Sequence, residues 1–274
     1  MKIRVAQSLG GGFDGTFAEA WGLEEYRSTF DFKEPTVFVG CYGLPDFYAI
    51  WRHKGDKYIF WCGSDIRHLH NGYWLDGKGQ IRLSSKGIAK WINDNCESWV
   101  ENEPERKALE YWGIKAQVCP SYIGDIDKIE PSYKPGNKLY ASVSSDDFAF
   151  YGWHKIDNLA EKYPDIEFHL YGNTKPFKPD NKNVIVHGRV PNEQMIEETK
   201  DMQGCIRMLP MEGFSELVAR SVLMEQWPIS VIPYKHCLLV EQIGEIPKEP
   251  NVEGRRYYLK ELNNFPFNCN KNVV

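Results

Sequence analysis

Short apolar runs alternate with amphipathic stretches along this chain. In the first half, four apolar runs predict strands, each followed by a glycine-bearing turn or a proline: Ile3–Gln7, Val37–Gly40, Tyr58–Trp61 and Gln117–Cys119. Helical patterns follow at Pro45–Arg52 and at Lys86–Trp112, the second one ending at Gly113. Strands that alternate with helices are typical of βαβ units with a mostly parallel sheet. The pattern therefore predicts an α/β fold.

The second half repeats this alternation more regularly. Its predicted strands are Lys138–Val143, Ile166–Leu170, Val184–Val186, Cys205–Leu209 and Ile229–Ile232. Between them, apolar positions recur with helical spacing in three stretches: 156–163, 191–200 and 214–222. After Pro233 the signal weakens, and the final KELNNFPFNCNKNVV predicts no obvious closing helix.

The segment from Ser121 to Asn137 separates the two halves. It shows no clear periodicity and contains two prolines and two glycines, a composition typical of an interdomain linker. We therefore predict two consecutive, doubly wound parallel-sheet domains, covering residues 1–130 and 131–274.

Composition narrows the classes of function. The 274 residues suffice for one large domain or two modest ones. With 33 basic and 38 acidic residues, the net charge of -5 argues against a dedicated nucleic-acid-binding protein, because phosphate contacts need a basic surface. The chain has no apolar run near the roughly 18 residues that a transmembrane helix needs. The sequence leaves peripheral membrane contact open.

The cysteines point to a reducing compartment. There are seven of them, an odd number, scattered without C-x-x-C pairs and without the Cys/His spacing of a zinc site. Free thiols are the simplest interpretation. Together with an N-terminal apolar run too short for a secretory signal, they predict a cytoplasmic protein.

In open parallel sheets, ligands bind in the loops that follow the carboxyl ends of strands, and three such loops carry candidate residues here. Gly11 and Gly12, in the glycine run after the first strand, either let backbone amides approach a phosphate or sugar or form a plain flexible turn. Asp65 follows the strand ending at Trp61, and it either orients an acceptor hydroxyl or caps the next turn. Arg189 either clamps a phosphate or lies solvated.

One further loop of this kind, after the strand that contains Arg207, has the largest number of candidate binding groups. The strand that contains Arg207 ends at a turn, Glu212-Gly213, and the next helix begins with Phe214 and Ser215. The amides of residues 213–215 become unpaired first-turn donors, which together with the helix dipole favour an anion. The alternative is simple N-capping by Glu212 or Ser215.

From this loop outward, the sequence resembles the retaining, nucleotide-sugar-dependent glycosyltransferases with two Rossmann-like domains, the GT-B type, and in particular glycosyltransferase family 4. The resemblance covers Lys138–Ile232 in order and spacing: KLYASVSS, IEFHLYG, VIVHGRVPNEQM, CIRMLP and EGFSELVARSVLMEQWPISVI. It extends more loosely to IFWCGSD and ENEPERKALEYWGIKAQVCPSYIG in the first half. It implies two Rossmann-like domains facing a cleft, with an abbreviated N-terminal domain on the acceptor side and a C-terminal domain that binds the nucleotide sugar.

The resemblance also implies roles for single residues. Glu212 would contact hydroxyls of the transferred sugar, and the amides of Gly213, Phe214 and Ser215 would bind the donor diphosphate. Arg189 and Arg207 would be charge partners of that diphosphate. From the first domain, Gly11 and Gly12 would face it, and Asp65 would lie near the acceptor.

The chain departs from the family pattern at two positions and in length. Arg220 stands where the second glutamate of the E-x7-E motif, the usual ribose ligand, is expected, and it lies four residues after Glu216, the spacing of a helical ion pair. Tyr151-Gly152 replaces a common Lys-Gly pair. The chain is also short for two full domains of this type.

The resemblance therefore implies a hexosyltransferase-like glycosyltransferase that acts with retention, without a metal or other cofactor, and with the nucleotide-diphosphate sugar as substrate. The acceptor is left open: a glycan, a lipid-linked molecule or a small molecule. No nucleic-acid partner is expected. The alternative is a non-catalytic protein that binds sugar nucleotides or glycans on the same scaffold. A nicotinamide-dependent Rossmann enzyme is disfavoured because no complete G-x-G-x-x-G occurs.

Overall fold

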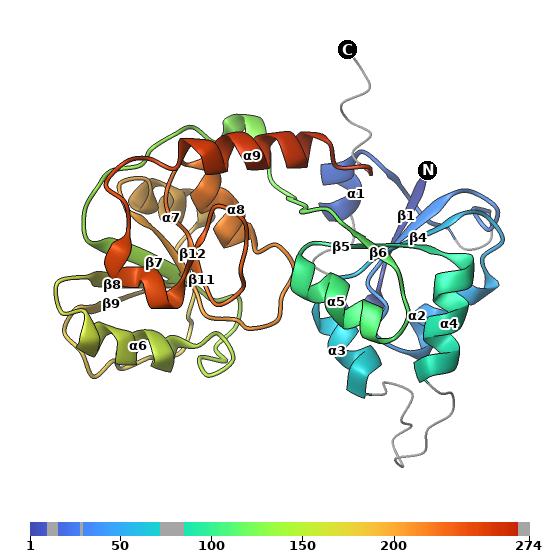
Figure 1. Cartoon of the computed structure of the whole chain (residues 1–274), viewed down its shortest axis with the longest axis horizontal. Helices are drawn as coiled ribbons and strands as arrows, with labels where there is room; N and C mark the ends of the chain where they lie inside the picture. Colours follow the sequence, from blue (N-terminus) through green and yellow to red (C-terminus); the bar gives the residue numbers. More distant parts are fainter. Residues whose placement is uncertain (10–15, 28–29, 72–84, 268–274) are drawn as a thin grey trace. The chain divides into compact units, whose positions relative to one another are not determined.

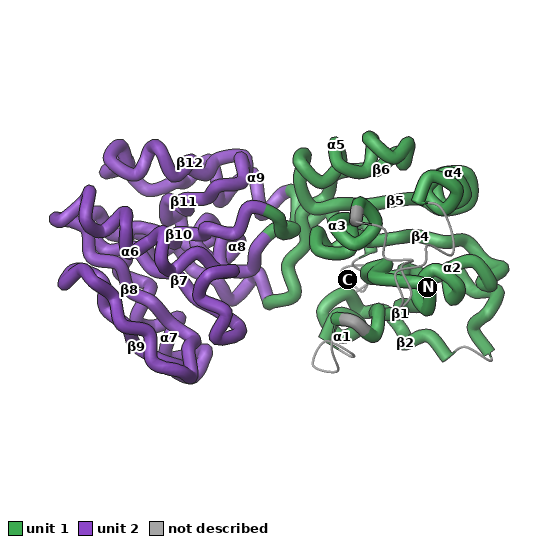
Figure 2. The backbone as a smooth tube through the Cα atoms, turned by 90° about the horizontal axis from the view of Figure 1, so that it is seen from below, with its two compact units in different colours: residues 1–124, 211–214, 261–274 green, residues 125–210, 215–260 purple. Residues whose placement is uncertain are grey.

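The chain folds into two compact units (Figure 2). The computed structural model describes residues 1–9, 16–27, 30–71 and 85–267. Unit 1 comprises residues 1–124, 211–214 and 261–274, and unit 2 comprises residues 125–210 and 215–260. The short segment 211–214, which carries Glu212, Gly213 and Phe214, thus clusters with unit 1, although its neighbours in sequence on both sides belong to unit 2.

Unit 1 is built on a parallel sheet (Figure 1). Within the described residues, its strands lie in the order β2-β1-β3-β4-β5-β6. Their bounds are Lys2–Val5 (β1), Glu24–Glu25 (β2), Thr36–Val39 (β3), Lys57–Phe60 (β4), Glu97–Val100 (β5) and Ala116–Val118 (β6). The helices between them are Thr16–Trp21 (α1), Leu44–Arg52 (α2), Ser64–Asn71 (α3), Ser85–Asn95 (α4) and Glu103–Tyr111 (α5), and a 3-10 turn spans Gln7–Leu9.

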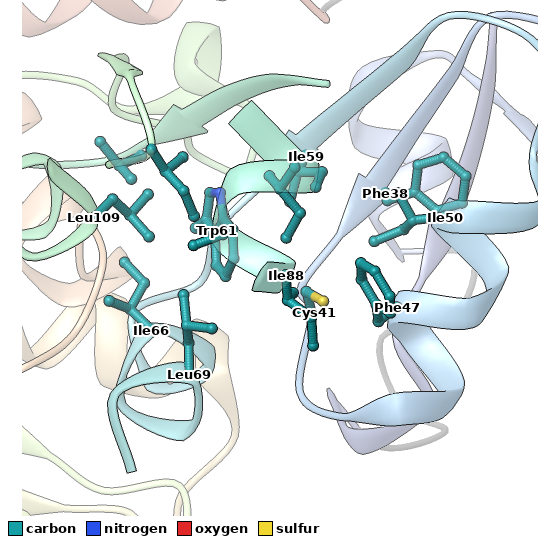
Figure 3. Packing of buried hydrophobic residues seen from close by; sticks show 14 residues of the cluster. Phe38, Cys41, Phe47, Ile50, Ile59, Trp61, Ile66, Leu69, Ile88 and Leu109 are labelled. Carbon is teal, nitrogen blue, oxygen red and sulfur yellow. The ribbon is translucent and has the colours of Figure 1, made fainter. Parts of the chain in front are cut away.

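The central strands β3 and β4 of unit 1 bury apolar side chains on both faces, and helices cover both faces. Phe38 and Ile59 pack with α2 to α5 on one face, whereas Val37 and Phe60 pack with α1 on the other. Successive side chains of a strand point to opposite faces, so apolar residues follow one another where both faces of the sheet are covered. Figure 3 shows the first face, where side chains of α3 lie beside Trp61.

The prediction of one helix over Lys86–Trp112 is wrong, because strand β5 divides it into α4 and α5. Residues 97–100 pair in parallel with β4 and β6. The second helix begins afresh at Asn102, an N-cap followed by a proline in the first turn. Strand β5 begins with two polar residues, Glu97 and Ser98, so it has no apolar run that would separate it from the helical patterns on either side.

Unit 2 carries a second sheet, and within the described residues its strands lie in the order β12-β11-β10-β7-β8-β9, all in parallel pairs. Their bounds are Lys138–Ser142 (β7), Glu167–Tyr171 (β8), Val184–Gly188 (β9), Gly204–Arg207 (β10), Ile229–Ser230 (β11) and Leu238–Leu239 (β12). The helices are Trp153–Lys162 (α6), Asn192–Thr199 (α7), Glu216–Leu223 (α8) and Val252–Asn263 (α9), and 3-10 turns span Ile126–Lys128 and Val240–Glu245. The predicted fold class, two doubly wound α/β domains, is confirmed.

The chain does have a closing helix, α9, contrary to the sequence-based expectation. Its buried positions are Gly254, Tyr258 and Leu262, spaced four apart, and Asn251 caps it by accepting a hydrogen bond from the Gly254 amide at 3.1 Å. A face built from a glycine, a tyrosine and a single leucine gives little hydrophobic contrast, so the pattern escapes detection.

No helix in the described ranges is long and apolar enough to cross a membrane. The cysteines that the structure describes are all free thiols: Cys41, Cys62, Cys96, Cys119, Cys205 and Cys237.

Candidate functional site

Two arginines of unit 2 donate hydrogen bonds at or just after the end of β7, beside the point where the order of the strands reverses. Successive connections run outward from β7 to one side and from β10 to the other, so a crevice is expected beyond their carboxyl ends. Arg207, at the end of β10, donates from Nη1 to the Ser142 carbonyl oxygen at 3.1 Å. Arg189, after β9, donates from Nη2 to the Ser144 carbonyl oxygen at 3.1 Å and from Nε to the Gly172 carbonyl oxygen at 3.2 Å. The Arg207 guanidinium group is therefore held against the last residue of β7, and that of Arg189 against the loop that follows.

Tyr151 positions one of these arginines. The Arg207 guanidinium carbon lies 5.3 Å from the centre of the Tyr151 ring, a cation–π arrangement, and the Tyr151 hydroxyl hydrogen-bonds the hydroxyl of Ser144. The next residue, Gly152, is the N-cap of α6 and adopts the left-handed conformation at φ 74°. A Cβ atom at this position would lie 2.5 Å from the Cβ atom of Met208. The Tyr151 ring therefore packs against the Arg207 guanidinium group and helps to hold it in place.

In unit 1, the turn Glu212–Phe214 is bonded to residues that follow strand β5. The Phe214 amide donates to Glu101 Oε2 at 3.0 Å, and the Asn102 side-chain amide donates to the Glu212 carbonyl oxygen at 2.8 Å. A Cβ on Gly213 would lie only 1.7 Å from the same Glu101 oxygen. The sequence predicts that the Phe214 amide binds an anion, and in the structure this amide donates to the chain's own Glu101 carboxylate.

Glu101 and Asn102 are fixed by local structure. Asn102 is the N-cap of α5, where its Oδ1 accepts the Glu105 amide at 2.9 Å. Glu101 Oε1 accepts from the Ser121 amide at 3.2 Å and from the Ser121 hydroxyl at 2.5 Å. Sequence reasoning missed this pair, although the run Asn102-Glu103-Pro104-Glu105 after an apolar segment is a recognisable helix start.

Asp65 is fully buried at the start of α3. Its oxygens accept backbone N–H groups of Cys41 and Cys62, each at 3.0 Å, and of Ile66 at 2.9 Å. Burial raises the pKa of its carboxyl group to about 6, against the opposing effect of these hydrogen bonds. The structure therefore favours the capping alternative for Asp65: it joins the loops after β3 and β4 and presents no surface to a substrate.

Glu105 is a second buried carboxyl group in this region. Desolvation, followed by repulsion from Glu101, raises its pKa well above the ordinary value, and Oε2 accepts the Glu101 amide at 3.0 Å. Gly63, at φ 76°, makes room for it, because a Cβ there would lie 2.7 Å from Glu105 Oε1 and 3.1 Å from the Glu212 backbone. The acidic side chains after β4 and β5 are thus packed closely beneath the turn.

Burial of Glu105 predicts a pH-dependent stability difference. The folded chain retains the Glu105 proton to a higher pH than the unfolded chain does, so the stability that depends on this group falls as pH rises above its ordinary range. We expect Glu105→Gln to match the wild type in free energy of unfolding at pH 4 and to exceed it by more than about 1 kcal/mol at pH 8, since one pKa unit corresponds to about 1.4 kcal/mol. Urea denaturation at both pH values measures this.

The control for this measurement is Glu103→Gln on the same helix. Glu103 is exposed and its pKa is lowered, chiefly by the Arg106 hydrogen bond, so its substitution offers no gain at pH 8. Equal stability of wild type and Glu105→Gln at pH 8 would show that Glu105 carries no destabilising charge.

A mainly apolar cavity of about 420 Å³ lies between α3 and α5 in unit 1. It is lined by Ile66, Arg67, His70, Ala108, Tyr111 and Met211. Met211 immediately precedes Glu212, and Ile66 immediately follows Asp65. The cavity therefore adjoins the turn that contains Glu212.

Comparisons with known proteins give the fold. No protein-family model and no curated protein matches the chain. Among solved structures, sucrose-phosphate synthase from Thermosynechococcus elongatus matches over 94% of this chain and 74% of its own, with TM-score 0.58 and 11% identity. α,α-Trehalose 6-phosphate synthase from Burkholderia multivorans matches over 93% and 73%, with TM-score 0.55 and 9% identity. TarM matches over 84% of this chain, with TM-score 0.50 and 14% identity, and this chain spans 51% of its length.

The chain has the GT-B fold. At these identities, the likeness supports the architecture, while the roles of individual residues rest on the geometry of this chain. The resemblance that the sequence shows to GT-B glycosyltransferases agrees with these structural neighbours.

Within the GT-B fold, the predicted site residues form two groups. Arg189 and Arg207 lie together in unit 2, and Glu212, Gly213 and Phe214 lie with the buried Asp65 in unit 1. Gly11 and Gly12 lie outside the described residues. Ser215 is the N-cap of α8, and its side chain makes no capping hydrogen bond.

Arg220 has a different partner from the one that its spacing suggests. Its Nη1 donates to Asn192 Oδ1, on α7, at 3.2 Å, in place of the ion pair expected with Glu216.

Among the described residues, no group of three or more His, Cys, Asp or Glu side chains is arranged to hold a metal ion.

Proposed function

We propose that this protein is a glycosyltransferase that moves a sugar from a nucleotide-diphosphate sugar to an acceptor hydroxyl. The observation that carries the proposal is the pair Arg189 and Arg207, held beyond the strands at which the order of a GT-B sheet reverses. Guanidinium groups bind phosphate oxygens with charge-assisted hydrogen bonds. A diphosphate is the ligand that this arrangement suits best.

The reaction requires stabilisation of a departing diphosphate. The bond between the sugar's anomeric carbon and the diphosphate oxygen breaks, and its electron pair leaves with that oxygen. The acceptor oxygen forms the new glycosidic bond and gives up its proton, which the released diphosphate accepts. Arg189 and Arg207 oppose the growing negative charge, and such stabilisation lowers the barrier when the donors are held in place beforehand. Retention and independence of metal ions are part of the proposal.

The turn Glu212–Phe214 is assigned to the sugar end of the donor. Glu212 would accept hydroxyls of the transferred sugar, and the amides of Gly213, Phe214 and Ser215 would bind the diphosphate. Because the Phe214 amide already donates to Glu101, we infer that this carboxylate gives way when the donor binds. Glu101 then acts as an internal anion that competes with the diphosphate.

The cavity between α3 and α5 is assigned to the acceptor. Its walls are mainly apolar, and they include the exposed ring of Tyr111 as well as Met211. A pocket of this kind suits an acceptor that carries an aromatic or other apolar group beside its reactive hydroxyl.

We expect Tyr111→Ala to raise the KM for an aryl glycoside acceptor about 5- to 10-fold, because a ring contact contributes about 1 kcal/mol or more. The KM for the donor should not change. Tyr48→Ala serves as the control, since Tyr48 is also exposed but does not line this cavity. Equal acceptor KM values for Tyr111→Ala and Tyr48→Ala would show that the acceptor does not bind in this cavity.

The alternative is a non-catalytic protein that binds sugar nucleotides or glycans. Arg220, which stands at the position of the usual ribose ligand, and Glu101, which occupies the Phe214 amide, both favour it. A panel of sugar nucleotides distinguishes the two functions. Release of nucleoside diphosphate supports the enzyme, whereas calorimetric binding without release across a broad acceptor set supports the binding protein.

A further inference from the structure

Another cavity in unit 1 lies at the amino ends of its strands, whereas Asp65 and Glu101 follow their carboxyl ends. Its volume is about 500 Å³. Lys54 and Lys57 line it where β4 begins, and Asn95 lines it just before β5. This cavity shares no lining residue with the candidate acceptor cavity of unit 1.

The cavity is positively charged. Arg52, at the end of α2, lines it together with Lys54 and Lys57, and none of its lining residues is acidic. Among the described residues, Lys57 Nζ donates to the Gly55 carbonyl oxygen at 3.1 Å, and none of the three cations has a carboxylate partner. His53 adds no charge at neutral pH, because burial lowers the pKa of its ring. Three cations thus face a space without a protein anion.

Two indole rings form the remaining walls. Trp51 is 52% exposed, an unusual exposure for so large an apolar side chain. Trp91 is fixed edge-on against Phe47, with ring centres 5.5 Å apart. Flat indole faces beside cations suit a ligand that has both ring faces and negative charge.

The loop that presents the cations is held in place by segment 32–34. The Lys54 amide donates to the Phe32 carbonyl oxygen at 2.9 Å, and His53 Nε2 donates to the Glu34 carbonyl oxygen at 2.8 Å. A Cβ on Gly55 would lie 2.4 Å from the Lys33 carbonyl oxygen, so only glycine allows this approach. The backbone of this loop is therefore fixed before a ligand binds, which reduces the entropy cost of binding.

We propose that this cavity binds an acidic glycan, with sugar rings packed on Trp51 and Trp91 and with phosphate, sulfate or carboxylate groups on Arg52, Lys54 and Lys57. Its volume accommodates one or two sugar rings. A nucleic acid fits less well, because the chain's net charge of -5 opposes a long polyanion beyond the cavity itself.

Calorimetry on the full chain at low salt tests this with three probes of matched length: a sulfated heparin-derived hexasaccharide, neutral maltohexaose and a single-stranded DNA hexamer. We expect the sulfated hexasaccharide to bind at least tenfold more tightly than either of the others, and its affinity to fall as salt rises. The double variant Arg52→Ser/Lys54→Ser and the single variant Trp51→Ala should each lose most of this affinity.

The matched control is Lys107→Ser/Lys115→Ser, which removes two exposed cations of unit 1 that do not line the cavity. It should bind the hexasaccharide as the wild type does. Three results would overturn the proposal: no binding of the sulfated hexasaccharide, equal binding by wild type and Arg52→Ser/Lys54→Ser, or tighter binding of the DNA hexamer. None of these readouts requires glycosyl transfer, so the proposal stands or fails independently of the proposed activity.

Discussion

Arg207→Ala is expected to weaken binding of a nucleoside diphosphate by about 10- to 100-fold. A hydrogen bond to a charged group contributes about 1.5–3 kcal/mol, and each 1.4 kcal/mol corresponds to a factor of ten. Arg207 is held by the Ser142 carbonyl group and the Tyr151 ring, so little entropy is lost when it meets a phosphate. Calorimetric titration with UDP and GDP measures the loss.

Two further variants locate this effect. Arg189→Ala should cause a smaller loss, because Arg189 is the more exposed of the two. Arg256→Ala is the control, since Arg256 is an exposed arginine of α9 that pairs with Glu253 at 2.7 Å. If Arg207→Ala and Arg256→Ala bind the nucleoside diphosphate equally well, the diphosphate does not bind at Arg207.

Glu101→Gln is expected to act in the opposite direction and to tighten binding of the nucleoside diphosphate about tenfold or more. Two unit charges 4 Å apart interact with about 4 kcal/mol at an effective dielectric constant of 20, so even part of this repulsion exceeds a factor of ten. The single glutamine oxygen can still accept from the Phe214 amide while the side-chain NH2 group donates to the Ser121 hydroxyl, so the turn retains its support and only the Ser121 N–H loses its acceptor. The same titration measures the gain.

Asn102→Ala separates charge from support of the turn. It removes the hydrogen bond to the Glu212 carbonyl oxygen and the cap of α5, and it leaves the Glu101 carboxylate in place. It should weaken binding, if it changes binding at all. Weaker or unchanged binding in Glu101→Gln would contradict the role of Glu101 as an internal competitor of the diphosphate.

Much of the fold follows from the sequence, because strands and amphipathic helices leave local periodic patterns. The strands around Val37, Leu139 and Ile206 are apolar on both faces and end in turns, and they occur as predicted. Strand β5 and helix α9 escape the pattern for physical reasons. The first begins with two polar residues, Glu97 and Ser98, and so lacks an apolar run, and the second buries Gly254 and Tyr258 where a leucine stripe would be recognised.

The candidate site could be predicted only in part. Arg207 and the turn at Glu212 can be named as candidates from the sequence because they lie at and just after a recognisable strand end. Glu101 was missed because its role depends on a contact with Phe214, more than a hundred residues away in sequence, which no local pattern contains. For Asp65, the residue type allowed both a substrate contact and a cap, and burial decided between them.

The most direct test of the central claim is release of nucleoside diphosphate from a panel of UDP-, GDP- and ADP-sugars, with a mixed set of aryl glycoside and oligosaccharide acceptors. We expect the wild type to turn over at least one donor, and Glu212→Gln to lower that rate by about 100-fold or more, the size of effect seen when one well-placed polar contact to a transition state is removed. Binding of the nucleoside diphosphate itself should change less than about threefold in Glu212→Gln, because Glu212 is assigned to the sugar. Absence of both binding and turnover for every donor, or equal turnover by wild type and Glu212→Gln, would contradict the account.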